Sequence, residues 1–174
     1  ADMFAAPTDF VTSRDGFTRP ANTTAYTAGD AVRATTSALQ PLMQFAAAAQ
    51  QPGGSGMIVG ARCMTDKDDW ASQQRLWLFT ADAPSVSAPA DNAAMTTMFQ
   101  NEPFWIGYLD FPTATEAADT TASTASYAFA DAQALPYRCL VASTAIYGVL
   151  TDATGQTPAS GQRFAVSLDL IRDR

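Results

Sequence analysis

The sequence predicts an all-β protein: an antiparallel β-sandwich of the jelly-roll or Greek-key type, with one short helix and an extended N-terminal arm. Three observations lead to this fold class. Seven to nine short strand-like runs are separated by loops rich in Gly, Pro, Ser and Thr. Residues 164–171 alternate with a period of two, which is typical of a half-buried strand. Long connections follow Thr80 and Phe111, as crossings between two sheets require.

The chain of 174 residues suits a single domain with a sizeable core. We expect an N-terminal arm over residues 1–12 and the β-sandwich over residues 13–174. The arm carries Met3, Phe4 and Phe10, and terminal arms are loose unless they dock. These three side chains are therefore candidate protein-contact residues, which would pack on the chain's own body or on a neighbouring subunit.

The first third of the sandwich begins with a strand, a turn and a second strand across residues 16–32. Pro20 removes a ladder donor after the first strand, and Asn22 suits the turn. The alternation over 24–28 predicts the second strand. Residues 42–45 favour a strand, although Ala46–Ala49 would also suit a helix that Pro41 interrupts. Residues 50–56 are Gly-rich and predict a loop.

Apolar runs predict the remaining strands. They cover residues 57–64, 75–80, 104–111, 126–130, 137–151 (one or two strands) and 164–171. The run at 75–80 is apolar on both sides, as in a central strand, whereas 126–130 suits an edge. Asp91 is expected to cap a short helix over 92–99. The last strand is expected to lie near the first.

The net charge of −7 is unevenly distributed, because residues 76–137 contain seven acidic residues and no Lys or Arg. A nucleic-acid-binding face needs positive charge, so this distribution argues against DNA or RNA as a partner. Only 16% of the residues are charged, which suggests that other protein covers part of the surface.

Two cysteines, Cys63 and Cys139, each fall within a strand-like run. Free, buried thiols are the favoured interpretation, and a disulfide between facing strands is the alternative. No secretory signal is visible before Phe10, and no run approaches the length of a membrane span. We therefore expect a protein made in a cytoplasm, without a membrane partner.

The sequence contains no His, which removes the usual catalytic base and the commonest metal ligand, and no phosphate-binding loop is present. Asp66, Asp68 and Asp69 lack the spacing of a calcium loop and suit a solvated turn. Glu102 and Asp110 could form a glycosidase pair, but Asp110 lies in a strand between Tyr108 and Phe111, which disfavours this interpretation. The sequence favours no catalytic residues, no metal and no cofactor, and so a protein that is not an enzyme.

Aromatic residues offer two further interpretations. Trp77, Trp105 and Tyr108 could form a sugar-stacking platform, but packing within the sandwich is the simpler interpretation. Trp70 stands beside three aspartates and is expected to be the most exposed tryptophan. It joins the candidate protein-contact residues as a possible anchor.

Two stretches resemble a known group of proteins. Arg-Pro-Ala-Asn-Thr-Thr-Ala-Tyr at 19–26, followed by Ala-Gly-Asp-Ala-Val at 28–32, resembles the opening of tailed-bacteriophage virion proteins. These include small β-sandwich decoration, or cement, proteins that bind the outside of the capsid. Residues 74–80 and 91–94 are similar in character.

The resemblance implies a virion structural protein on the capsid exterior, made in the host cytoplasm and bound to the major capsid protein. It would stabilise the lattice as a homo-oligomer, with a homotrimer favoured over a homodimer. The alternative from another class is a carbohydrate-binding module for host attachment, in which Trp70, Trp105 and Tyr108 would stack on sugars.

Overall fold

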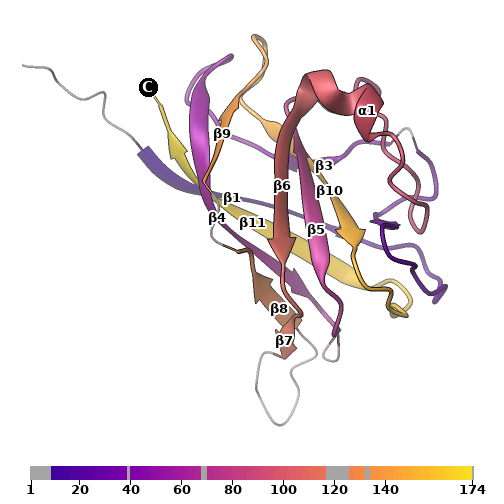
Figure 1. The fold of residues 1–174 in the computed structure, drawn as a ribbon. Helices are drawn as coiled ribbons and strands as arrows, with labels where there is room; N and C mark the ends of the chain where they lie inside the picture. The colour runs from indigo at the N-terminus through magenta and orange to yellow at the C-terminus, as the bar shows by residue number, and fades with distance from the viewer. Residues whose placement is uncertain (1–8, 39, 68–69, 117–125, 132–133, 174) are drawn as a thin grey trace, which may run out of the picture.

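The computed structural model describes residues 9–38, 40–67, 70–116, 126–131 and 134–173. Two antiparallel sheets face each other and one short helix lies at an end of them, so the predicted all-β sandwich is confirmed (Figure 1). The main hydrophobic core fills the space between the sheets.

The six-stranded sheet contains, in order, β1 (Asp9–Thr18), β11 (Arg163–Arg172), β4 (Ser55–Thr65), β8 (Ser126–Phe129) and β7 (Thr115–Glu116), with β9 (Leu135–Arg138) also paired to β4. The five-stranded sheet contains β2 (Ala31–Val32), β10 (Ile146–Asp152), β5 (Gln74–Phe79) and β6 (Trp105–Phe111), with β3 (Met43–Phe45) also paired to β10. The helix α1 (Met98–Asn101) continues into the 3-10 turn η1 (Glu102–Phe104) before β6.

The last strand pairs with the first, as expected. β11 runs antiparallel to β1 from Phe17 opposite Phe164 to Asp9 opposite Arg172. Because β1 begins at Asp9, the last four residues of the expected arm form part of the sheet. The rest of the arm, including Met3 and Phe4, lies outside the described residues.

The apolar character of β5 on both faces has a structural cause. Leu76 and Leu78 point into the main core. Trp77 and Phe79 point the other way, into a second cluster with Val86 and other residues of the segment that connects β5 to α1. The prediction of a central strand is confirmed, since β5 lies between β10 and β6.

Several local predictions are wrong. β8 lies between β4 and β7 rather than at an edge, and β4 already begins at Ser55, within the expected loop over 50–56. Residues 24–28 form no strand, and only the two-residue β2 follows them. The helix expected over 92–99 is instead the four residues of α1. Asn92 has a φ of 59°, which a helix cannot accommodate at its first residue, and the Asp91 side chain turns into the core.

Both cysteines are buried and free, so the favoured interpretation holds and no disulfide forms. Cys63 lies in β4, and its thiol donates to Oε1 of Gln74 at 3.1 Å. Cys139 follows the end of β9 rather than lying within a strand. Neither thiol is placed for chemistry, because a buried thiol resists ionisation.

Stability is expected to fall as the pH rises above about 9. Burial raises the pKa of Cys63 to about 12, and burial also raises the pKa values of Cys139, Tyr26 and Tyr137. The folded chain therefore keeps protons that the unfolded chain releases. Cys63 alone makes the free energy of unfolding fall by about 1.4 kcal/mol per pH unit between its two pKa values.

Urea denaturation at pH 7, 9 and 10.5 measures this loss. In the Cys63→Ala variant the slope of stability against pH should be shallower by about one proton. A midpoint that stays constant up to pH 10.5 in the original chain would contradict the expectation.

Candidate functional site

The structure separates the predicted contact residues. Phe10, on β1, exposes 62% of its surface and remains available for contact. Trp70 exposes 1%, so the prediction of an exposed anchor is wrong. Its indole packs edge-on against Phe164 and Tyr26, with ring centroids at 5.5 and 6.5 Å, and the Lys67 ammonium lies 5.7 Å from its centroid.

The outer face of the six-stranded sheet is the first candidate surface. We define it by the even-numbered residues of β1 (10–18), the odd-numbered residues of β11 (163–171) and residues 57, 62 and 64 of β4, which alternate with residues that face the core. The face so defined contains no Lys or Glu and carries Phe, Ile, Met and Arg. Aromatic residues, Met and Arg are enriched at protein interfaces and Lys and Glu are depleted there, although this face also carries Asp169, Ser167 and Ala165, which are depleted types.

An apolar row crosses the outer face at one end. Phe10 is opposite Ile171, Ile171 is opposite Met57, and Met57 is opposite Pro136 of β9. Phe10, Met57 and Pro136 are exposed. Cross-strand neighbours of this kind form one continuous apolar strip about 14 Å wide, because adjacent strands lie about 4.8 Å apart.

Two arginines lie near the middle of the outer face. Arg14 and Arg62 both stand opposite Ser167, one on each side of it. Both side chains are exposed, and within the described residues neither forms an ion pair. The outer face therefore presents free positive charge on a chain whose net charge is −7.

A shallow depression lies at the other end of the outer face. Its volume is about 650 Å³, and Gly16, Ala165, Met64 and Arg163 are among the residues that line it. The floor is low because Gly16 and Ala165, opposite each other, have little or no side chain. Gly16 is required here, since a Cβ at this position would lie 2.7 Å from the carbonyl oxygen of Phe164.

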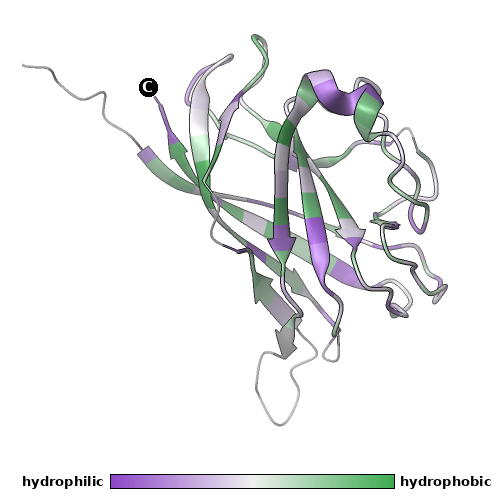
Figure 2. Ribbon diagram, viewed as in Figure 1, coloured by the Kyte–Doolittle hydropathy of each residue, from purple (hydrophilic) through white to green (hydrophobic). Residues whose placement is uncertain are grey.

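The loop end of the sandwich is the second candidate surface. We define it by Phe99 in α1, Trp105 at the start of β6, and Leu140 and Val141 in the loop after β9, all elements at the top of Figure 1. Phe99 and Val141 expose 93% and 88% of their surface. Figure 2 shows the hydrophobic colour of the loop after β9. Exposed apolar side chains gathered at one end are a feature of contact sites.

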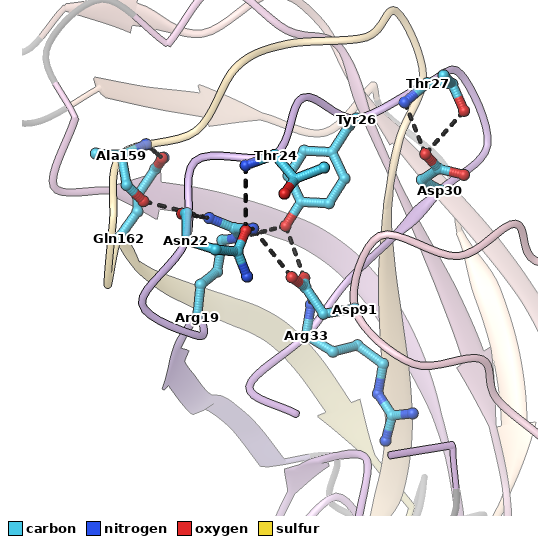
Figure 3. A network of polar contacts seen from close by, with 10 residues as sticks. All are labelled: Arg19, Asn22, Thr24, Tyr26, Thr27, Asp30, Arg33, Asp91, Ala159 and Gln162. Carbon is cyan, nitrogen blue, oxygen red and sulfur yellow. Dashed lines mark hydrogen bonds and ion pairs between the residues drawn. The ribbon is translucent and has the colours of Figure 1, made fainter. Parts of the chain in front are cut away.

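A buried ion pair organises the segments beside the five-stranded sheet (Figure 3). Arg19, just after β1, pairs with Asp91 at 2.9 Å, and both side chains are almost completely buried. The hydroxyl of Tyr26 accepts from Nε of Arg19 and donates to Oδ1 of Asp91 at 2.7 Å. The backbone N–H of Arg33 donates to the same oxygen at 3.0 Å.

The network joins loops that are distant in sequence. Arg19 also donates to the carbonyl oxygen of Ala159 at 3.2 Å, and Arg33 donates to the carbonyl oxygens of Pro89 and Gln40 at 2.6 and 2.7 Å. Desolvation lowers the pKa of Arg33 from its ordinary value. Each buried charge of this network has an opposite charge or a hydrogen-bond partner. We call the network the structural lock, because it holds these segments together.

Sequence reasoning did not find this lock. Arg19 and Tyr26 lie within the stretch that resembles virion proteins, and Asp91 opens the second such stretch. No periodic pattern links residue 19 to residue 91, however, and the Asp91 side chain was instead expected to cap a helix.

Of the three aromatic residues that could form a sugar-stacking platform, the structure brings Trp77 and Tyr108 together, with ring centroids 5.5 Å apart. Asp110 accepts from Nε and Nη2 of Arg75 at 2.6 and 2.9 Å, so it is held in an ion pair. That hydrogen bonding raises the pKa of Arg75. The Arg75 guanidinium also lies 4.0 Å from the Tyr108 ring centroid, so it occupies one face of that ring.

The described residues contain neither a group of metal ligands nor a helix suited to span a membrane. Among the described residues, no three His, Cys, Asp or Glu side chains are grouped to hold a metal ion. Asp66 pairs with Arg163 at 2.8 Å, while Asp68 and Asp69 lie outside the described residues. No helix in the described ranges has the length and apolarity that a membrane span needs.

Comparison with known proteins gives a sparse result. No protein-family model matches the chain, and no curated protein matches it. A solved chain from "Acidic stable capsid structure of Helicobacter pylori bacteriophage KHP30" aligns with 95% of this chain and 93% of its own length, at 9% identity and a TM-score of 0.29. A TM-score this low supports no functional conclusion.

Proposed function

We propose that this chain is a virion structural protein, a decoration or cement protein that binds the outer capsid lattice of a tailed bacteriophage and stabilises it. The resemblance of residues 19–32 to phage virion proteins supports the proposal. The loop end is the structural observation that supports the proposal. Its apolar side chains Phe99 and Val141 are almost fully exposed and belong to neither hydrophobic cluster of the fold. The partners are the major capsid protein and further copies of this chain.

In the proposed mechanism, binding of this protein shifts the equilibrium of the capsid toward the assembled shell. A protein that binds only the closed lattice stabilises it relative to the loosened lattice. The loop end would bury its apolar side chains across a joint between capsid subunits. Contacts of roughly 1,600 Å² in total, repeated over a symmetric lattice, suffice for firm attachment. Such a role needs no catalytic residue and no cofactor.

Purified particles of the phage that carries this chain provide the test. Quantitative mass spectrometry should find on the order of hundreds of copies per particle, because a lattice site recurs with the symmetry of the shell. The major capsid protein in the same sample is the internal standard. Absence from particles, or only a few copies, would refute a decoration role.

Deleting residues 1–8 is expected to lower shell occupancy or heat resistance, because this segment carries Met3 and Phe4 as candidate contacts. The deletion ends before β1 and so leaves all ten residues of that strand in place. Occupancy is measured on particles, and the particle melting temperature reports heat resistance. A full-length Met3→Ser/Phe4→Ser variant is the matched control for chain length. Unchanged occupancy in both would remove the arm from the mechanism.

A further inference from the structure

We propose that the outer face of the six-stranded sheet binds a second copy of this chain in a symmetric dimer. The twofold axis lies between the stacked faces, perpendicular to the strands, and crosses β11 above Leu168. This inference rests on the outer face alone and is independent of capsid binding. Two sheets stacked in this way pack about 10 Å apart, as in a β-sandwich.

The shapes of the two ends of the outer face are complementary under this axis. Residue 171 of one copy faces residue 165 of the other, so Ile171 lies over the second copy's Ala165. In β1, Ser13 is level with Leu168, and Phe10 therefore lies over the second copy's Gly16. The exposed apolar row of each copy thus fills the depression of the other, where Gly16 and Ala165 leave room.

The charges are complementary in the same register. Residue 169 faces residue 167, which places Asp169 between the second copy's Arg14 and Arg62, because these arginines flank Ser167. One oxygen of Asp169 accepts from Thr12 at 2.7 Å within its own chain, and the other oxygen is left for the arginines. Symmetry repeats this contact, so the Asp169 carboxylate of each copy offsets one of the two free positive charges on the other copy.

Neighbouring registers are unfavourable. An axis above Ser167 would stack Arg14 on the second copy's Arg14, and an axis above Asp169 would stack Asp169 on itself. An axis parallel to the strands would place Arg14 over the second copy's Arg62. Like charges directly opposed in an interface disfavour association, so the charge pattern selects the axis above Leu168.

The available area fits a stable pair. β1 and β11 contain ten residues each, about 33 Å at 3.3 Å per residue. The sheet is four strands wide, about 19 Å, when β8 and β9, which pair with the far side of β4, are included with the outer face. This is roughly 600 Å² in flat projection, near the ~800 Å² of accessible surface per partner of a standard interface. A trimer, favoured in the sequence analysis, would need two different patches in contact, whereas this face complements itself.

Sedimentation velocity on the purified chain tests the proposal. The original chain, at 1–100 μM, should sediment as a dimer of the 18.4 kDa chain. The Asp169→Arg variant should be monomeric, and so should the Arg14→Asp/Arg62→Asp variant, with the dissociation constant raised on the order of a hundredfold. Glu102→Arg changes the charge by the same amount as Asp169→Arg, in η1 away from the outer face, and should remain dimeric.

Mixing the two monomeric variants gives the decisive measurement. Each then meets the opposite charge, so an equimolar mixture should form a heterodimer although neither variant pairs with itself. Recovered pairing also shows that both variants are folded. A monomeric original chain, a trimer, a dimer that survives Asp169→Arg, or a mixture that stays monomeric would each overturn the proposal.

Discussion

Replacing Asp91 with alanine is expected to reduce the free energy of unfolding by about 3–5 kcal/mol, because it leaves the Arg19 guanidinium buried without a counter-charge. The two side chains expose 0% and 1% of their surface, so water cannot replace the lost carboxylate. The hydroxyl of Tyr26 and the N–H of Arg33 lose an acceptor at the same time. Urea denaturation monitored by tryptophan fluorescence measures the change.

Three variants complete this experiment. Asp131→Ala removes an exposed aspartate and should change stability by less than about 0.5 kcal/mol. Tyr26→Phe should cost about 1–3 kcal/mol, because it removes only the bridging hydroxyl. The double variant Arg19→Met/Asp91→Leu should recover much of the loss, since apolar residues replace buried ion pairs well. If Asp91→Ala and Asp131→Ala unfold at the same urea concentration, the lock does not stabilise the fold.

Replacing Trp70 with alanine is also expected to cost about 3–5 kcal/mol, as truncation of a fully buried tryptophan does. The indole contacts Phe164 from β11 and Tyr26 from the network, and its loss leaves a cavity between them. An exposed contact residue would behave differently, because its removal would weaken partner binding while leaving stability unchanged.

Phe99→Ala is the matched control for Trp70→Ala. Phe99 exposes 93% of its surface, so its truncation should change stability by less than about 0.5 kcal/mol. Thermal and urea unfolding of both variants distinguish the two environments. Equal midpoints for the two variants would be incompatible with the burial of Trp70.

The strands were predictable where burial repeats along the sequence. β11 alternates core and outer-face residues, and β5 is apolar throughout because each of its faces meets a hydrophobic cluster. In both strands the pattern of apolar and polar side chains shows which faces of the strand are buried, so these strands could be predicted from the sequence alone.

The errors arose where a distant partner decides the local structure. The three neighbouring aspartates suggested that Trp70 was exposed, but Tyr26 and Phe164, far away in sequence, enclose it. Asp91 has the side chain of a helix cap, yet Arg19 and Tyr26 draw it into the core. The outer-face complementarity was also hidden, because it depends on the register between β1, β11 and β4.

The position of β11 determines when the larger sheet can be completed during synthesis. β11 leaves the ribosome after every other strand of that sheet, yet its place is between β1 and β4. Among the strands that the structure describes, β1 pairs only with β11, so it has no sheet partner until β11 has been made. Closing a loop of this length is a slow, non-local event. Insertion of β11 between β1 and β4 is thus the step that joins the strands of the larger sheet and closes the main core beneath them.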